Sequence, residues 1–365
     1  MHLEPSPDRM PELGFYTLAG HSASPRDCAA EAQDAERIGI GSVLVSERFN
    51  VKEACTLCGA VGAVSEDLGI VTSATNLQTR HPMVTASFAN TMHQLTGGRF
   101  AFGLGRGIEV LGSMYGIQPS SMSEMESFTV LMRRLWAGEM VGGVEHHMGS
   151  SPLMFLQNAE PADIPVVMSA IGPRTLEWAG GVMDGVILHT YFSDEATARS
   201  VEAVRRGAEK AGRDPSSVRI WSVLATVGDH LGHDLVMKKT VGRLATYLQG
   251  YGEVLLAANG WDPAPLDAFR SDEVVSSVPG AIDAVATTEQ LEHIATLFPA
   301  EWLDAAATGT AQQCARTALA QFDLGVDSVV LHGATPLELE PVVQAYRGIR
   351  PAGRFDDLPV NPGWM

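Results

Sequence analysis

The chain of 365 residues has little cysteine, no long apolar run and few basic residues relative to acidic ones. Four cysteines are too few for a disulfide framework and suit the reducing cytoplasm, so we expect a cytoplasmic protein. Cys55 and Cys58 form a lone CxxC pair without the further ligands that a zinc site needs. Their helical spacing favours two core side chains, and no metal site is predicted.

Other absences limit the partners of the protein. No apolar run reaches the roughly 20 residues that span a bilayer, and residues 1–13 are polar and proline-rich, unlike a secretion signal. The 43 acidic residues outnumber the 25 basic ones, which gives a net charge of −18. Such a surface repels nucleic acid and anionic membranes. We therefore expect neither as a partner.

Short apolar runs alternate along the chain with amphipathic segments. The predicted strands are 13–18, 42–46, 69–73, 100–104, 166–168, 186–188, 218–227 and 328–331. The predicted helices are 25–38, 51–64, 82–95, 124–136, 175–180, 194–211, 235–256, 288–298, 311–324 and 337–346. Eight apolar strands alternating with helices predict an α/β fold, a single (β/α)₈ TIM barrel over residues 1–350.

Two departures from a minimal barrel are expected. An insertion of about residues 235–310 enlarges the seventh βα unit, with a loose Pro-, Asp- and Ser-rich stretch at 259–279, and residues 351–365 form a surface tail. A doubly wound open sheet is the competing architecture. It requires a glycine fingerprint after the first strand, where residues 18–24 hold one glycine.

Residues 165–188 predict a strand, a glycine–proline turn, a helix and a second strand. Pro173 suits the first position of a helix, and Gly172 precedes it. A helix start leaves backbone N–H groups unpaired, which makes a site for an anion such as a cofactor phosphate. The predicted phosphate cup consists of Ala170, Ile171, Gly172, Pro173, Arg174 and Thr175.

The active site of such a barrel lies at the carboxyl ends of its strands. Glu47 and Arg48 follow the second strand, and they form either an ordinary ion pair at the rim or part of the catalytic apparatus. In the second case Arg48 supplies positive charge to a ring system that becomes anionic on reduction, and Glu47 holds Arg48 or moves a proton. Arg106 and Glu109, after the fourth strand, leave the same two possibilities open.

Histidines near strand ends are further candidates. His189 follows the sixth strand directly and is a candidate general acid or base. His81 precedes a helix, where capping or packing competes with ligand contact. Gly105 and Gly107 leave room for a group lying across the barrel, or serve a tight turn only.

Several motifs together resemble the luciferase-like monooxygenase superfamily of flavin and deazaflavin enzymes, and more closely its branch that uses coenzyme F420. They are residues 43–49 (VLVSERF), 79–82 (TRHP), 98–107 (GRFAFGLGRG), 135–139 (LWAGE), 170–174 (AIGPR) with Asp184-Gly185, and 325–331 (GVDSVVL). The resemblance implies a bacterial luciferase-like barrel and a homodimer formed through the helices at 51–64 and 82–95.

The resemblance also implies where the cofactor lies. A non-proline cis peptide bond, matched by Ser73-Ala74, forms a bulge under the central ring, and the cup binds the phosphate. The implied cofactor-binding residues are Ser73, Ala74, Thr75, Asn76, Arg106 and Gly107, together with the six residues of the cup. The Gly172-Pro173 turn resembles the F420 branch, whereas flavin-dependent relatives tend to carry a serine there.

One departure from the branch bears on catalysis. Many relatives carry Asp-His after the second strand, and this chain has Glu47-Arg48. Arginine is no general base near neutral pH, so a base must be Glu47, Glu109, His81 or His189, or none is needed. No lysine or arginine occurs in residues 189–192, which disfavours a phosphorylated substrate, and two aromatic residues there favour an apolar or unsaturated one.

The predicted activity is hydride transfer between F420 and a small organic substrate, an alcohol or carbonyl compound or a conjugated double bond. The alternatives are an FMN-dependent monooxygenase of the same superfamily and a non-catalytic protein that binds the cofactor or a metabolite.

Overall fold

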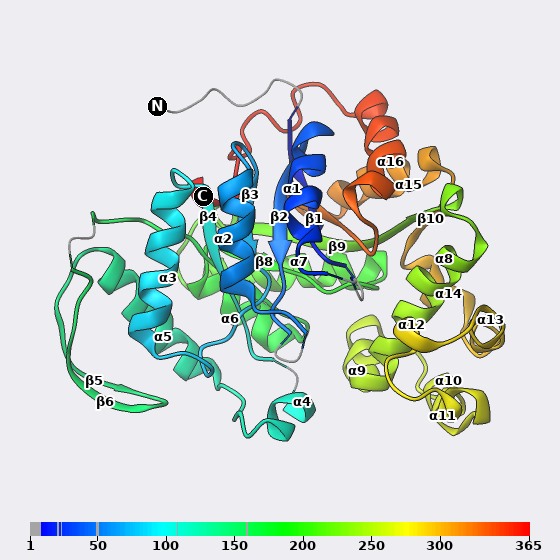
Figure 1. The fold of residues 1–365 in the computed structure, drawn as a ribbon, viewed down its shortest axis with the longest axis horizontal. Coiled ribbons are helices and arrows are strands. Elements are labelled where there is room, and N and C mark those ends of the chain that lie inside the picture. Colours follow the sequence, from blue (N-terminus) through cyan, green and yellow to red (C-terminus); the bar gives the residue numbers. More distant parts are fainter. Residues whose placement is uncertain (1–8, 20–21, 23, 49–50, 108, 158–159) are drawn as a thin grey trace.

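The computed structural model describes residues 9–19, 22, 24–48, 51–107, 109–157 and 160–365, with the backbone alone at 109–111. Eight parallel strands form a closed ring in the order β1, β2, β3, β4, β7, β8, β9, β11 (Figure 1). Their bounds are β1 (Met10–Tyr16), β2 (Ile40–Val45), β3 (Gly69–Thr72), β4 (Phe100–Gly105), β7 (Val166–Ser169), β8 (Gly185–Ile187), β9 (Arg219–Gly228) and β11 (Ser328–His332). The predicted barrel and its eight strands are confirmed.

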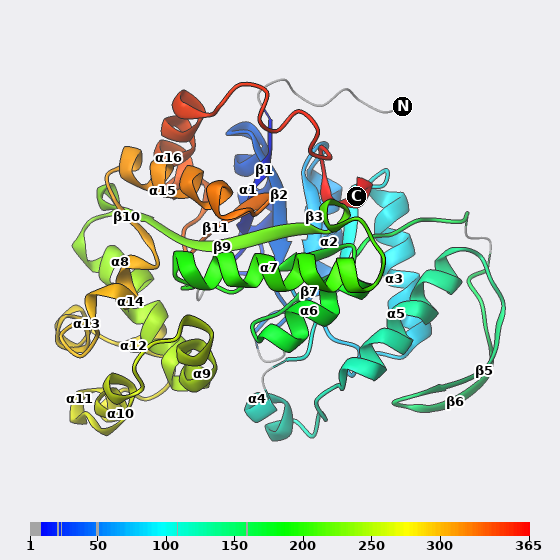
Figure 2. The same cartoon turned by 180° about the vertical axis from the view of Figure 1, so that it is seen from behind.

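Helices surround the ring, as Figures 1 and 2 show from opposite sides. They are α1 (Asp27–Arg37), α2 (Ala54–Val64), α3 (Pro82–Leu95), α5 (Met122–Trp136), α6 (Pro173–Val182), α7 (Asp194–Lys210), α15 (Ala311–Gln321) and α16 (Pro336–Ile349). Helix α2 begins later than the predicted residue 51 because the Glu53 carboxylate caps it, accepting hydrogen bonds from the backbone N–H groups of Cys55 and Thr56. Among the residues described, all four cysteines are free, and Cys58 is buried.

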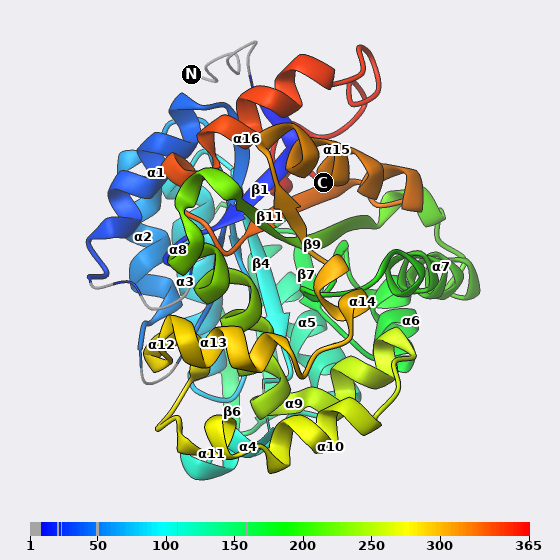
Figure 3. The same ribbon diagram turned by 90° about the vertical axis from the view of Figure 1, so that its right-hand side faces the viewer.

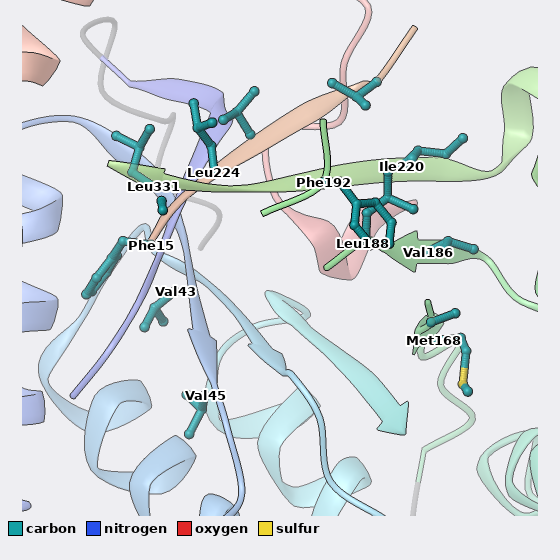
Figure 4. Close-up of a cluster of buried hydrophobic side chains, with 14 of the residues drawn as sticks. Phe15, Val43, Val45, Met168, Val186, Leu188, Phe192, Ile220, Leu224 and Leu331 are labelled. Atoms are coloured by element: carbon teal, nitrogen blue, oxygen red, sulfur yellow. The ribbon is translucent and has the colours of Figure 1, made fainter. Parts of the chain in front are cut away.

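Alternation along the strands divides the core into two. One set of side chains faces the helices, including Phe15, Val43, Val45 and Leu331 (Figure 4). The other set fills the barrel; its buried members are Leu44, Val71, Ala101, Val167, Ile187, Trp221, Val223 and Val330. Because successive residues of a strand point to opposite faces, the next inward position beyond each strand opens at the barrel mouth.

Two features between β4 and β7 differ from the sequence prediction. A short helix, α4 (Glu109–Met114), lies in a stretch expected to be irregular, and β5 (Val141–His146) pairs with β6 (Gly149–Met154) as an antiparallel hairpin. The hairpin projects from the barrel beside α3 and α5 (Figure 1). Its glycines and mostly solvent-exposed side chains give no apolar alternation, which is why the sequence pattern missed it.

The chain after β9 is helical almost throughout. It forms α8 (His233–Met237), the π-helical turn η3 (Lys238–Gly242), α9 (Arg243–Asn259), α10 (Ala264–Ser271), α11 (Glu273–Ser277), α12 (Ile282–Val285), α13 (Thr288–Ala295) and α14 (Ala300–Asp304). The loose segment predicted at 259–279 is therefore wrong: α10 buries Leu266 and Phe269 there. These helices gather on one side of the barrel (Figure 3), and the short strand β10 (Ala307–Gly309) then pairs with β9 outside the ring.

The carboxyl-terminal tail was predicted to run over the surface, and this is wrong for its last part. Asn361, Pro362 and Gly363 are buried, and Met365 packs against the side chains that fill the barrel. A Cβ atom at Gly363 would lie 1.9 Å from the backbone oxygen of Gly98. The tail thus covers the end of the barrel opposite the mouth. Within the described residues, no helix is long and apolar enough to cross a membrane.

Candidate active site at the barrel mouth

The inward positions at the carboxyl ends of the strands carry polar side chains. Ser73, Ser169, His189 and His332 each come two residues after a side chain that fills the barrel, and Tyr16 packs on that same interior cluster. Tyr16 Oη lies 2.5 Å from Ser73 Oγ, and Ser73 Oγ lies 3.4 Å from Ser169 Oγ. The Tyr16 and His332 rings are in edge contact at 5.1 Å. We call these five residues the mouth cluster.

The Ser73–Ala74 peptide bond is cis, as the resemblance implies. Neighbouring strands hold this bend from both sides: Ser73 N donates to Val45 O at 2.7 Å, and Thr75 N donates to Gly103 O at 3.0 Å. Gly103 permits the close approach, since a Cβ atom there would lie 1.7 Å from the Thr72 carbonyl oxygen. The bend is thus held between β2 and β4 at the barrel mouth.

Glu47 is paired with Arg80, a partner that the sequence analysis did not predict. The two nitrogens of the Arg80 guanidinium donate to Glu47 at 3.0 and 2.6 Å. Glu47 also accepts from the Thr75 hydroxyl, and Arg80 bonds Glu53. The Glu47 side chain is only 5% exposed. Arg80 therefore links the rim after β2 to the bend after β3.

The Arg48 backbone closes a turn, since Arg48 N donates to Lys52 O at 3.1 Å. Arg106 is exposed, and its Nε donates to Ser120 O at 3.0 Å, which ties the rim after β4 to the start of α5. Gly107 has a φ of 76°, so the glycine serves a left-handed turn there. The side chain of Glu109 lies outside the described residues, so its predicted role remains a prediction.

Asn76 and His81 have local structural partners. The Asn76 side-chain oxygen accepts from Gln78 N and Thr79 N, both at 2.9 Å, which closes a turn. His81 Nδ1 accepts from Met83 N at 3.2 Å and caps α3, while its ring contacts His146 of the hairpin at 4.6 Å. Of the two possibilities for His81, these contacts favour capping and packing.

The predicted phosphate cup lies at the start of α6. Gly172 is the N-cap residue, makes no side-chain cap hydrogen bond, and is followed by Pro173 and by no acidic residue in the first turn. Open space surrounds Gly172, because a Cβ atom there would meet no atom within 4 Å. A groove of about 640 Å³ runs from Pro173 and Arg174 along the outside of α6 and α7. The helix start therefore offers its N–H groups to an anion.

His189 is held on both ring nitrogens. Its Nδ1 lies 2.8 Å from the Thr190 carbonyl oxygen, and its Nε2 lies 2.9 Å from Tyr251 Oη of α9. Burial lowers the pKa of His189 to about 4, although the bond to Thr190 opposes the shift. Burial also holds the pKa of His332 well below its usual range, and the positive charge of Arg243 lowers it further. Both imidazoles are therefore neutral at pH 7.

Sequence reasoning missed Tyr16, Ser169, Tyr247 and Tyr251 and left Arg80 without a role. The first two could be found from the alternation of β1 and β7 continued to the mouth. The two tyrosines of α9 are set by a tertiary contact, and no local pattern signals it. Within the described ranges, no group of three or more His, Cys, Asp or Glu side chains could hold a metal ion.

Comparison with known proteins agrees with this geometry. The profile of the family described as luciferase-like monooxygenase matches residues 11–328. The chain therefore belongs to the luciferase-like monooxygenase family, a family of oxidoreductases.

The chain is also similar to individual proteins. The chain is 29% identical over 240 residues to 5,10-methylenetetrahydromethanopterin reductase of Methanolobus tindarius, covering 64% of this chain and 71% of that one. The coenzyme F420-dependent tetrahydromethanopterin reductase from Methanopyrus kandleri has the same fold, with a TM-score of 0.74, 18% identity, and coverage of 92% and 97%. An F420-dependent secondary alcohol dehydrogenase, solved with an F420-acetone adduct, also has this fold. Its TM-score is 0.69 and its sequence identity 18%, over 93% of this chain and 99% of that one.

Proposed function

We propose that the protein is an F420-dependent oxidoreductase that transfers a hydride between the deazaflavin and a small, non-phosphorylated organic substrate. The observation that carries this proposal is the start of α6, a helix without a side-chain cap and with open space at Gly172. It follows β7, whose last residue, Ser169, has its Oγ 3.4 Å from Ser73 Oγ at the bend. A helix terminus of this kind suits a phosphate, and the bend suits the flat ring of the same molecule. F420-dependent enzymes among the similar proteins support the choice of cofactor.

The residues present fit such a group. The N–H groups of Arg174 and Thr175 would bind the phosphate, and Ser73 and Ala74 would support the ring. When bound, F420 accepts or supplies the hydride. Glu47 is tied to Arg80 and Thr75, so its first role is to hold the rim around the bend in place. Neutral His189 serves to orient its neighbours.

The substrate side of the mouth is aromatic. Tyr247 and Tyr251 of α9 lie against His189 at ring distances of 5.1 and 5.3 Å. This wall suits an uncharged alcohol or carbonyl compound, or a conjugated double bond, better than a phosphorylated molecule. Such a surface also limits the water that reaches the reacting atoms.

Titration of the purified protein with F420 and with FMN tests the proposal. We expect a saturable change in F420 absorbance, and a much weaker response to FMN. Gly172→Asp places a carboxylate at the N-cap, which stabilises a helix and repels a phosphate. We expect this variant to bind F420 at least tenfold more weakly with an unchanged melting temperature. Gly348→Asp, at another open position remote from the mouth, is the matched control.

Other outcomes would contradict the proposal. Tight binding of FMN without F420 binding would favour a flavin monooxygenase. F420 binding without turnover of alcohols, carbonyl compounds or enones would favour a non-catalytic cofactor-binding protein. Equal F420 affinity in the two aspartate variants would show that the cup does not hold the phosphate.

We also propose a homodimer formed through α2 and α3. The exposed side chains of Val84 and Leu95 on α3 and Val51 just before α2 support an interface there, at 57%, 53% and 54% exposure. Light scattering on Val84→Glu, compared with Val254→Glu on α9, tests it: only the first should give monomers. The few cysteines, all free where described, support a cytoplasmic location.

A further inference from the structure

Helix α9 brings a phenol to the edge of the barrel mouth. At Tyr251 the backbone leaves helical geometry, with φ −159° and ψ 41°. Tyr251 Oη lies 2.9 Å from His189 Nε2, a contact between residues 62 positions apart in the chain. Tyr251 is partly exposed at the edge of the mouth.

The hydrogen bonds of His189 fix the direction in which the phenol proton points. The Thr190 carbonyl can only accept a hydrogen bond, so His189 Nδ1 carries the proton. In the neutral ring Nε2 can then only accept, and the hydroxyl of Tyr251 must donate to it. The Tyr251 oxygen is left with lone pairs and with no proton to offer a ligand.

The surroundings keep this arrangement rigid. The Tyr247 ring lies 5.1 Å from His189 and 5.6 Å from Tyr251. The Arg243 guanidinium lies over the Tyr247 ring, 5.9 Å from the ring centroid, and is paired with Asp283 at 2.8 Å. A hydrogen bond is stronger in such a desolvated place, and an unmatched polar group there is more costly.

We propose that Tyr251, positioned by His189, is the hydrogen-bond acceptor for the substrate and selects a hydroxyl compound over the carbonyl compound of the same skeleton. A hydroxyl group completes the lone pairs of the phenol oxygen. A carbonyl oxygen is itself an acceptor, so it forms no hydrogen bond with the Tyr251 oxygen, and both oxygens are left without a donor. The redox role of the site rests on the proposed function, but this selectivity is a property of binding.

Calorimetric titration of the F420-loaded protein with cyclohexanol and with cyclohexanone tests the proposal. We expect the alcohol to bind about tenfold more tightly, the effect of one net hydrogen bond. Tyr251→Phe keeps the ring but removes the acceptor, and should bring the two affinities within twofold. Tyr346→Phe, which removes a buried phenol hydroxyl bonded to Glu12 at the far end of the barrel, should leave the preference unchanged.

A variant of His189 separates positioning from packing. His189→Phe removes the acceptor for the phenol proton and leaves Tyr251 able to donate. Cyclohexanone should then bind more tightly than in the wild type, and the preference for cyclohexanol should be lost because the freed phenol can both donate and accept. A purely structural role would weaken both ligands together.

The proposal is overturned if the wild type binds neither compound, prefers the ketone or shows no preference, or if Tyr251→Phe keeps the alcohol preference. The titrations are repeated on protein without cofactor. Failure to bind F420 while the alcohol preference persists would contradict the proposed function alone. Loss of the preference in protein that does bind F420 would contradict the role of Tyr251 alone. Melting temperatures of each variant identify any that fail to fold.

Discussion

Gly103 of β4 has no room for an added methyl group, and the strands on either side of it shape the barrel mouth. A Cβ atom there would lie 1.7 Å from the Thr72 carbonyl oxygen and 3.0 Å from a methyl group of Val167. The nearer atom belongs to the backbone, so β3 and β4 would have to move apart. Gly103→Ala therefore disturbs the strands that hold the bend at Ser73.

The magnitude follows from the contacts at this point. Overpacking of a dense core costs about 1–3 kcal/mol even when side chains can adjust. The Thr72 hydroxyl also accepts from Gly103 N at 2.7 Å and donates to Gly103 O at 2.9 Å. Two such bonds, at about 1 kcal/mol each, are lost when the strands separate. We expect Gly103→Ala to lower the free energy of unfolding by about 3–5 kcal/mol.

Urea denaturation followed by circular dichroism measures this change, and F420 titration measures the effect on the mouth. The control is Gly59→Ala in α2, where a Cβ atom would meet nothing within 4 Å. Alanine is a better helix former there, so the control should be stabilised by about 0.5–1 kcal/mol. A loss below 1 kcal/mol in Gly103→Ala, or an equal loss in both variants, would refute the reasoning.

Two further predictions concern the charged and titratable groups of the mouth. Arg80→Gln leaves the buried carboxylate of Glu47 without its cation and should lower the free energy of unfolding by about 3 kcal/mol; unchanged urea denaturation would contradict the pairing. The pKa of His189 is about 4 in the folded chain and ordinarily 6.5, so the unfolded chain binds a proton that the folded one does not. The contribution of neutral His189 to the free energy of unfolding is therefore fully present above pH 6.5. The free energy of unfolding should fall by up to about 3 kcal/mol as the pH drops to 4. His189→Gln should show a shallower decline.

The mouth explains why sequence patterns found some site residues and missed others. Ser73 and His189 directly follow apolar strands, and the polar residue after a buried run marks the mouth of a parallel barrel. Tyr16 obeys the same alternation but lies inside the strand predicted at 13–18, so it reads as part of the apolar run. Ser169 was read only as the residue that ends the strand predicted at 166–168, whereas it is the last residue of β7. Arg80 stands in a loop, and only the fold brings it onto Glu47.

The helices after β9 show the limit of composition as a guide. Residues 259–279 hold several Pro, Asp and Ser residues and were predicted to be loose, yet Pro263 and Asp272 act as helix N-caps there. The tail was misjudged for a related reason. Its Pro and Gly residues suit a surface loop, but they also suit close backbone packing, and Gly363 lies against the chain at Gly98.

The family resemblance of the motifs implied the bend at Ser73-Ala74. The sequence by itself determined the (β/α)₈ barrel and the helix start at Gly172. These features depend on the order of apolar runs and on local backbone chemistry, which neighbouring residues specify. Only the tertiary structure decided that Glu47 pairs with Arg80, that Tyr251 reaches His189, and that the tail covers the far end of the barrel. These contacts join residues that are distant in the chain, and their geometry depends on how the whole barrel closes.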